Sequence, residues 1–285
     1  TFFGILDKRF LIDLWIETLI SWPLIFFGTI MLTEPFTTPP TKKLQLFYGV
    51  IVGVLCNIQF HFGPIFSSPE FALVIGNIFS YLVSPKQKLF LIFKTKNKLA
   101  QDTYEFIFQT ERIPSYKAGQ YLEWTLPHKH TDSRGNRRYF TVASSPTENE
   151  IKLGVRFNTP PSSYKNALQS LEDGNKLIAA QLAGDFTLPK DPSEKLVFIA
   201  GGIGITPFRS MIKYLIDTKE KRDIVLLYTN KKPEEIAYQD IFAQAEKEIG
   251  LKPVYILTDK DCVPGNWSGC TGHIDEKMLT EQIPD

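Results

Sequence analysis

The sequence is poor in the residues that build metal centres and disulfide frameworks. Its 285 residues include only three cysteines and four histidines, and neither set shows a CxxC pair, a catalytic triad or a metal-ligand spacing. A disulfide framework is therefore not expected, which favours a reducing compartment for the soluble part. The net charge of +1 gives no basic surface of the kind that nucleic-acid binding needs. We therefore expect no metal site and no nucleic-acid partner.

Charge is scarce over the first part of the chain, since only six residues between Leu11 and Val83 carry a formal charge. The apolar stretches in this part are Leu11–Leu32, Leu44–Phe66 and Phe71–Val83. The first two exceed the about 20 residues that a membrane-spanning helix needs, and the third is a weaker candidate because it is short. The alternative, buried helices of a soluble core, fits such lengths less well. Residues 1–85 are therefore predicted to be a transmembrane helical segment.

Lysines flank these apolar stretches. Lys42 and Lys43 separate the first two, and five lysines between Lys86 and Lys98 follow the third. Because lysine-rich loops stay in the cytoplasm, we expect a multi-pass membrane protein whose soluble domains are cytoplasmic. Three polar residues inside the second stretch have two interpretations, interhelical hydrogen bonding or the lining of a pathway: Asn57, Gln59 and His61.

A period-two pattern of apolar residues begins after Pro85. Such alternation predicts strands with one buried face, and turn signals recur between them. Residues 86–190 are therefore expected to form a small antiparallel barrel. The alternating residues are Tyr104, Phe106 and Phe108, then Ile151, Leu153 and Val155, and the turns are Lys117–Gly119, Ser133–Asn136 and Glu172–Gly174.

The strongest chemical signal is Arg138–Pro146, with the sequence RYFTVASSP. A flavin site needs a bidentate cation for a phosphate, an aromatic surface for the isoalloxazine ring, and a polar group near N5, which takes the hydride. Residues two apart on a strand share a face, so Arg138 and Phe140 are expected to point together. Thr141 then turns away or makes contact through its backbone. An ordinary strand with an exposed arginine is the alternative.

This segment resembles the flavin motif of the ferredoxin–NADP reductase superfamily, in which arginine, any residue, an aromatic residue and serine or threonine follow one another. The resemblance implies that Arg138 holds a flavin phosphate, Phe140 packs on the ring, and Thr141 contacts the ring near N5. It includes Tyr139 among the cofactor-binding residues. Phe140 replaces the usual tyrosine of the family, which removes one hydroxyl. The implied cofactor is FAD or FMN.

A second element follows the strand that ends at Val155 and Arg156. Residues 160–168, PPSSYKNAL, predict a helix with Ser162 or Ser163 as its N-cap, and the exposed amides of a helix start suit a phosphate. The resemblance places the flavin phosphate at Ser163 and the neighbouring amides, and adds Val155 and Ser162 to the site. A plain capped helix fits the sequence equally well.

A glycine loop follows the short apolar run at Lys195–Ala200, and apolar residues at helical spacing follow the loop. A strand, a glycine loop and a helix start together suit a pyrophosphate. The ferredoxin–NADP reductase superfamily carries this Gly-Gly-x-Gly-x-x-Pro loop, and the resemblance places Thr206 at the nicotinamide end. We predict Thr206 as the N-cap and Pro207 as the first helical residue. The predicted nucleotide-binding residues are Gly201, Gly202, Gly204, Thr206 and Pro207.

Residues 191–285 are predicted to form an NAD(P)-binding α/β domain with a parallel sheet, in which Asp223–Thr229 and Val254–Thr258 are further strands. The loop after the strand Asp223–Thr229 resembles the family's loop near the adenosine ribose. Lys231 or Lys232 in this loop either pairs with a 2′-phosphate or is simply solvated. The family continues into a strand ending in Cys-Gly, whereas this sequence stops at Asp285. We therefore interpret it as part of a longer protein.

The first 85 residues resemble the C-terminal half of a flavin-carrying membrane subunit. The segments that carry this resemblance are Met31–Pro40, Phe47–Gly49, Gly53 and Pro69–Asn77. The family is the large membrane subunit of sodium-pumping NADH:quinone oxidoreductases and RNF electron-transport complexes. Its covalent flavin is attached to a threonine of a segment with no match here, so we assign no covalent flavin residue.

The expected fold is thus transmembrane helices followed by an antiparallel β-barrel flavin domain and an α/β nucleotide-binding domain. The expected function is a membrane-bound NAD(P)H-dependent flavin oxidoreductase that passes electrons to quinone or a redox partner subunit, with Thr141 and Thr206 nearest the chemistry. One alternative is a non-catalytic membrane or ion-pathway subunit that docks a redox partner. Another is a ferric-reductase type enzyme, but its haem needs paired histidines and the apolar part has only His61.

Overall fold

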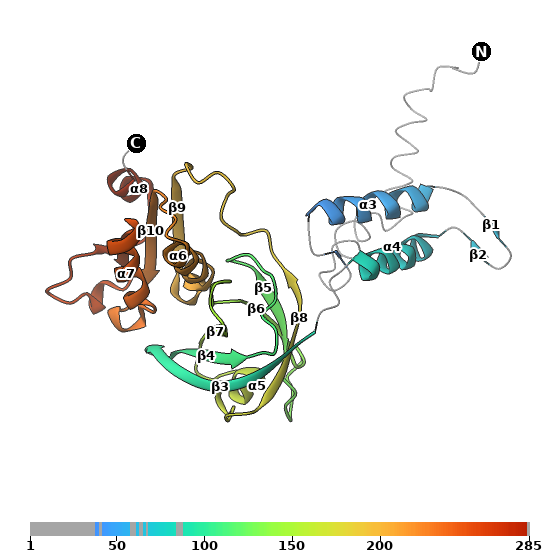
Figure 1. Cartoon of the computed structure of the whole chain (residues 1–285), viewed down its shortest axis with the longest axis horizontal. Helices are drawn as coiled ribbons and strands as arrows, with labels where there is room; N and C mark the ends of the chain where they lie inside the picture. The colour runs from blue at the N-terminus through green and yellow to red at the C-terminus, as the bar shows by residue number, and fades with distance from the viewer. Residues whose placement is uncertain are drawn as a thin grey trace, which may run out of the picture. The chain divides into compact units, whose positions relative to one another are not determined.

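The computed structural model describes residues 38–39, 42–57, 61–62, 65–66, 68–83 and 88–283 (Figure 1). The chain divides into two compact units, Thr1–Pro85 and Lys86–Asp285. The first predicted membrane span, Leu11–Leu32, lies outside the described residues.

Two short helices make up most of the described part of the first unit. Helix α3 (Lys42–Asn57) has 16 residues and helix α4 (Pro69–Val83) has 15. They pack closely, because a Cβ atom on Gly76 would lie 2.5 Å from Cγ2 of Val52 and 2.8 Å from Cε2 of Tyr48. A residue larger than glycine at this crossing would therefore push the two helices apart.

The second predicted span, Leu44–Phe66, is wrong as a single helix. Helix α3 ends at Asn57, and the rest of the stretch contains β1 (His61–Phe62) and β2 (Ile65–Phe66), which pair antiparallel. The uncharged run satisfies a hydropathy criterion, but the Gly-Pro pair that the sequence places between the two strands is a poor helix former. Within the described ranges, no helix combines the length and the hydropathy that crossing a membrane requires.

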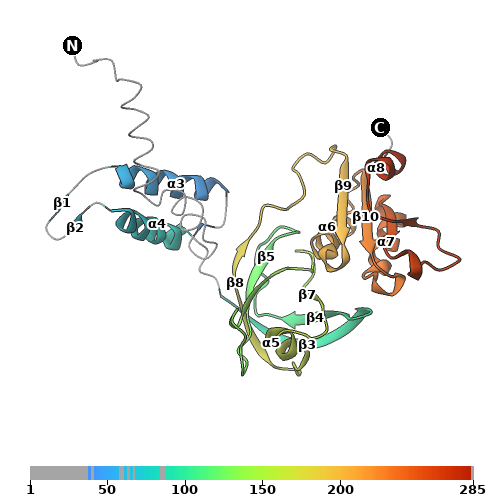
Figure 2. The ribbon, with the colours of Figure 1, turned by 180° about the vertical axis from the view of Figure 1, so that it is seen from behind.

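Six antiparallel strands form the first half of the second unit (Figure 2). They lie in the order β6-β5-β8-β3-β4-β7 and curl into a half-barrel around an apolar core. The two edge strands approach each other, since just beyond β6 the amide of Ala143 donates to the carbonyl of Lys152 in β7 at 2.8 Å. The predicted antiparallel barrel is therefore confirmed as an antiparallel half-barrel of six strands. The strands are β3 (Leu89–Ala100), β4 (Thr103–Gln109), β5 (Tyr121–Thr125), β6 (Arg137–Thr141), β7 (Ile151–Arg156) and β8 (Lys176–Ala183), and helix α5 (Ser163–Gln169) follows β7.

Strand β4 is buried on both faces, although its alternation predicted one buried face. Phe106 and Phe108 lie in the half-barrel core with no exposed surface. On the other face, Glu105 is 6% and Ile107 is 9% exposed. Burial raises the pKa of Glu105, although the positive charge of Arg209, from the second half of the unit, acts to lower it. The nucleotide-binding half therefore covers this face of the strand.

The turn before β5 requires glycine at position 119. Gly119 has φ +98°, and a Cβ atom there would overlap the carbonyl oxygen of Phe186. We expect Gly119→Ala to lower the free energy of unfolding by about 3 kcal/mol or more, because strain adds to a clash with backbone. Gly135→Ala is the matched control: its φ is +68° with no atom within 4 Å of the added Cβ, so the loss should be about 1 kcal/mol. Denaturant unfolding of both variants measures the difference, and equal losses would contradict the clash.

A four-stranded parallel sheet, in the order β12-β11-β10-β9, forms the second half of this unit. Strands β9, β10 and β11 agree with the predicted ones to within a few residues, whereas β12 was not predicted. Two α-helices and three 3-10 turns connect the strands, and a third α-helix follows the last one. The elements are β9 (Leu196–Gly201), η2 (Gly202–Ile205), α6 (Thr206–Thr218), β10 (Ile224–Asn230), η3 (Pro233–Glu235), α7 (Gln239–Ile249), β11 (Lys252–Leu257), η4 (Lys260–Cys262), β12 (Cys270–Thr271) and α8 (Glu276–Gln282).

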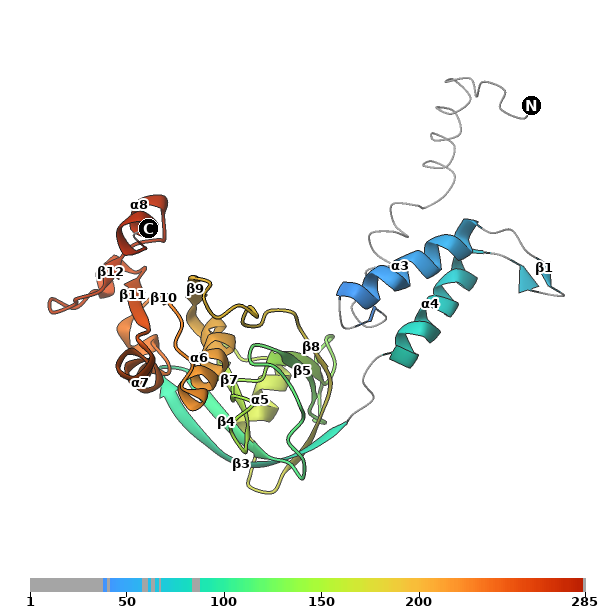
Figure 3. The same ribbon diagram turned by 45° about the horizontal axis from the view of Figure 1, so that its top comes forward.

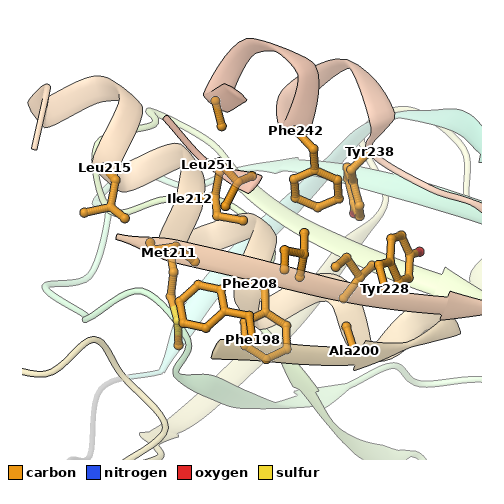
Figure 4. Close-up of a cluster of buried hydrophobic side chains, with 14 of the residues drawn as sticks. Phe198, Ala200, Phe208, Met211, Ile212, Leu215, Tyr228, Tyr238, Phe242 and Leu251 are labelled. Atoms are coloured by element: carbon orange, nitrogen blue, oxygen red, sulfur yellow. The ribbon is translucent and has the colours of Figure 1, made fainter. Parts of the chain in front are cut away.

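Both faces of this sheet carry apolar side chains, as expected for parallel strands. On one face Leu226 and Tyr228 of β10 pack with residues of α6 and α7 such as Ile212 and Phe242 (Figure 4). On the other face Val225 and Leu227 pack against residues of α8 and β11. The sheet therefore holds the loop after β9 and the start of α6 at its carboxyl edge, where α/β proteins bind nucleotides.

Candidate flavin and nucleotide site

Strand β6 carries the predicted flavin residues on two faces. The guanidinium carbon of Arg138 lies 5.1 Å from the centroid of the Tyr164 ring, and the Phe140 and Tyr164 rings are 5.9 Å apart. Arg138 and Phe140 therefore share a face, as the strand period predicted. Tyr139 faces the other way, and its hydroxyl donates to Glu123 Oε2 at 2.9 Å. Burial, reinforced by the Glu123 carboxylate, raises the pKa of Tyr139.

The start of α5 lies against this arginine. Ser162 is the N-cap and its side chain accepts from the Lys165 amide, whereas Ser163 is the first helical residue. The Ser163 hydroxyl accepts from the Asp132 amide at 3.0 Å and lies 3.2 Å from Nε2 of His128. Both serines are thus held near Arg138 by contacts with the β5–β6 loop or the helix.

Positive charge gathers at this end of the half-barrel. Burial, followed by the charges of Arg134 and Arg156, lowers the pKa of Lys165. Arg134 and Arg138 both contact the carboxylate of Asp132, at 3.1 and 2.9 Å. Clustered guanidinium groups with neighbouring hydroxyls form the donor set that a pyrophosphate needs. The residues present therefore fit the phosphate groups of a flavin nucleotide.

The glycine loop after β9 lies open to a ligand. Gly202 has φ +48°, which favours glycine, and a Cβ atom on Gly204 would meet no atom within 4 Å. Beside it, at the end of β10, Asn230 is 4% exposed, and its side chain lies against the Tyr228 hydroxyl. This arrangement fits a dinucleotide at the sheet edge.

The half-barrel and the glycine loop meet at Gly154 of β7. A Cβ atom on Gly154 would lie 2.7 Å from both the Thr206 methyl group and the Tyr238 hydroxyl. Nearby, Arg156 of β7 pairs with Glu235 at 2.5 Å. Strand β7 thus touches the first residue of α6 directly.

Figure 3 shows helix α6 beside strand β7 of the half-barrel. Side chains of α6 are also hydrogen-bonded to the backbone that follows β6. Arg209 donates to the carbonyl of Ala143 at 3.0 Å, and the Ser210 hydroxyl donates to the carbonyl of Ser144 at 2.6 Å. The same guanidinium forms an ion pair with Glu148 of the β6–β7 loop. These bonds fix the start of α6, and with it the glycine loop, relative to Thr141.

Known proteins match both halves of this unit. Residues 198–285 match the model of the oxidoreductase NAD-binding domain. The glycine betaine monooxygenase reductase subunit of Pseudomonas aeruginosa is 26% identical over 195 residues, which cover 66% of this chain and 52% of that protein. One component of the Na(+)-translocating NADH-quinone reductase of Yersinia pestis is 31% identical over 158 residues, covering 52% and 39%. The chain spans about half or less of the length of these two relatives.

A solved structure extends the match to the order of the two halves. The flavohemoglobin of Malassezia yamatoensis, determined with bound FAD and haem, aligns with a TM-score of 0.58 and 22% identity, over 74% of this chain and 55% of that chain. The half-barrel followed by the parallel-sheet domain therefore shares its fold with this protein, and the second of the two halves is the one matched by the NAD-binding model. The chain contains a reductase module that resembles the ferredoxin–NADP reductase type. The module is that of an NAD(P)H:flavin oxidoreductase, and FAD and NAD(P) are its cofactors.

Val155 is 2% exposed and packs in the half-barrel core, as the alternation along β7 predicted, so only its backbone can face a cofactor. Two residues of the reductase module lie one position away from the prediction. Thr206 is the first residue of α6 and not its N-cap, because Ile205 occupies that position, and Pro207 is therefore the second helical residue. For the other predicted site residues, the cofactor-binding roles stay predictions.

Sequence reasoning missed the residues that join the two halves of the module. Glu148, Arg209 and Glu235 are ordinary charged residues in the sequence, and no local pattern distinguishes them. Only the position of Arg209 on the buried side of α6, among apolar residues at helical spacing, signals that it lies inside.

Proposed function

We propose that the module takes reducing equivalents from NAD(P)H and delivers them, through FAD held by β6 and its surroundings, to a separate redox partner. One observation carries this proposal: Arg209 and Ser210 of α6 are bonded to Ala143 and Ser144, directly after the flavin strand. NAD(P)H bound at the glycine loop and the isoalloxazine ring on Phe140 would then be held at a fixed position relative to each other. Fixed relative position is what hydride transfer requires of the protein.

The residues have distinct tasks in this proposal. Arg138 and the hydroxyls of Ser162 and Ser163 bind the flavin phosphates, and Phe140 supports the ring with Thr141 at its edge. Gly201–Gly204 and the start of α6 receive the dinucleotide phosphates. FAD held by these residues would supply a two-electron acceptor for one hydride and a one-electron donor to the next carrier. No acid or base side chain is needed, so the residues bind and orient and do not exchange protons.

The test is flavin reduction under anaerobic conditions. The purified chain, loaded with FAD, should lose its oxidised-flavin absorbance on addition of NADH or NADPH, with one of the two reacting faster. The Gly204→Val variant is the control, because a side chain in the open loop should slow reduction while leaving bound flavin unchanged. Flavin that both nucleotides fail to bleach would refute the proposed function.

We further propose that the acceptor lies at or in a membrane to which residues 1–85 attach the module, with the module on the cytoplasmic side. The apolar stretches of the first unit and the lysines that follow them support this. Alkaline extraction of membranes from expressing cells tests it: the full chain should stay in the pellet, whereas recovery in the supernatant would exclude integral attachment. A non-catalytic docking role fits less well, since it needs neither the glycine loop nor the Arg138 cluster.

A further inference from the structure

Both terminal nitrogens of Arg138 are engaged by neighbouring residues of the chain. Its Nη1 donates to the carbonyls of Arg134, Gly135 and Arg137 at 2.9, 3.0 and 2.6 Å. Its Nη2 donates to both carboxylate oxygens of Asp132, at 2.9 and 3.2 Å. Nη1 thus meets three carbonyl oxygens with its two hydrogens, and one hydrogen of Nη2 points at the Asp132 carboxylate. A phosphate that binds the fork of this guanidinium must displace some of these acceptors.

Asp132 makes the contacts that a bound phosphate would make. Its carboxylate accepts from the Arg134 amide at 3.0 Å and from Arg134 Nη2 at 3.1 Å, in addition to the two contacts with Arg138. Two guanidinium groups and a backbone amide around one anion are a typical phosphate-binding set. Its own backbone amide donates to the Ser163 hydroxyl oxygen, which leaves the Ser163 O–H as a donor. Asp132 thus competes for Arg138 through its carboxylate and contacts Ser163 through its amide.

We propose that Asp132 is an internal competitor for the flavin phosphate: its carboxylate holds the β5–β6 loop on Arg138, and cofactor binding opens that loop. This inference rests on the proposed binding of FAD at Arg138. The apparent affinity for FAD is then the intrinsic affinity reduced by the fraction of molecules with the loop open. Asp132 tunes how firmly the module retains its flavin, and releasing the contact is the step that limits loading.

The competition has a specific mutational signature. Asp132→Asn keeps the size of the side chain and removes its charge, so the loop should open more readily and FAD should bind about tenfold more tightly and load faster, as expected for loss of one charge-assisted contact. Asp173→Asn is the matched control, because it changes the net charge equally. The Asp173 carboxylate is 3.7 Å from Lys94, in an exposed pair at another turn. Its FAD affinity should stay within about twofold of the wild type, as for an exposed pair.

The experiment is a titration of the purified full chain with FAD, followed by quenching of flavin fluorescence, with stopped-flow measurement of the loading rate. When Asp132→Asn is combined with Arg138→Ala, the gain in FAD affinity should vanish, because the Asp132 carboxylate then has no Arg138 guanidinium to compete for. Weaker binding in Asp132→Asn would overturn the proposal and make Asp132 a residue that positions Arg138. An unchanged affinity would also overturn it. If the wild-type chain binds no FAD at all, the proposed function itself fails, which is a separate outcome.

Discussion

An Arg209→Ala variant is expected to lose about 3 to 5 kcal/mol of unfolding free energy, the typical result of removing one partner of a buried ion pair. Arg209 is 3% exposed, and its guanidinium pairs with Glu148 and donates to the carbonyl of Ala143. It also lies 5.7 Å from the ring centroid of Tyr238. Alanine would leave the Glu148 carboxylate and the Ala143 carbonyl without this donor at the junction of the two halves.

The same helix offers a control for this loss. Lys213 pairs with Asp217 one turn further on, and both side chains are 24% exposed. Lys213→Ala should cost about 0.5 kcal/mol or less, as surface pairs at this spacing do. Denaturant unfolding at neutral pH compares the two variants. If Arg209→Ala proved no more destabilising than Lys213→Ala, the buried pair would not hold the junction together.

Acid titration adds a readout that is specific to the pair. Burial opposes ionisation of Glu148, but the hydrogen bond and charge of Arg209, with help from Lys152, lower its pKa to about 2 from a usual 4.5. A carboxylate whose pKa is lowered by folding contributes stability above its unfolded pKa, and this is lost as the pH falls through the folded value. The wild type should therefore lose stability between pH 4.5 and pH 2. In Glu148→Gln, the part of this loss that Glu148 contributes should disappear.

The local parts of the fold could be predicted from the sequence, because each depends on neighbours along the chain. The period-two spacing of Phe106 and Phe108 predicts a strand. The position of the glycine loop between a strand and a helix predicts a nucleotide site. The burial of Glu105 on the opposite face of the same strand could not be predicted. Its covering residue, Arg209, lies in another domain, and only the assembled fold brings the two together.

The prediction of one helix over the apolar stretch Leu44–Phe66 failed for a local reason. Counting charges detects that a segment is apolar, but it ignores where the backbone can continue a helix. The structure ends the helix at Asn57, before the Gly-Pro pair of the sequence. The candidate site divides in the same way: Arg138 was found from its motif, whereas the contact of Asp132 with it depends on how an irregular loop folds back.

Arg138→Ala should be the most damaging single change for cofactor binding, with FAD affinity falling by roughly 30- to 1000-fold if the arginine contributes about 2 to 4 kcal/mol through charge-assisted, bidentate contacts. Its guanidinium is placed for this task by the strand period, which turns it toward Tyr164 and the start of α5. The Phe140 surface for the ring remains in the variant, so residual binding should be weak but should not vanish.

The neighbouring arginine is a close control because it lies on the other face of the same strand. Arg137 is 56% exposed and contacts Glu123 at 3.4 Å, away from Tyr164. Arg137→Ala removes the same charge one residue earlier, so long-range attraction to the phosphates falls equally in both variants, while only Arg138→Ala removes the direct contact. Fluorescence titration with FAD, with thermal unfolding to confirm that both variants are folded, separates the two effects. Equal losses in the two variants would mean that net charge, and not the fork of Arg138, holds the flavin phosphate.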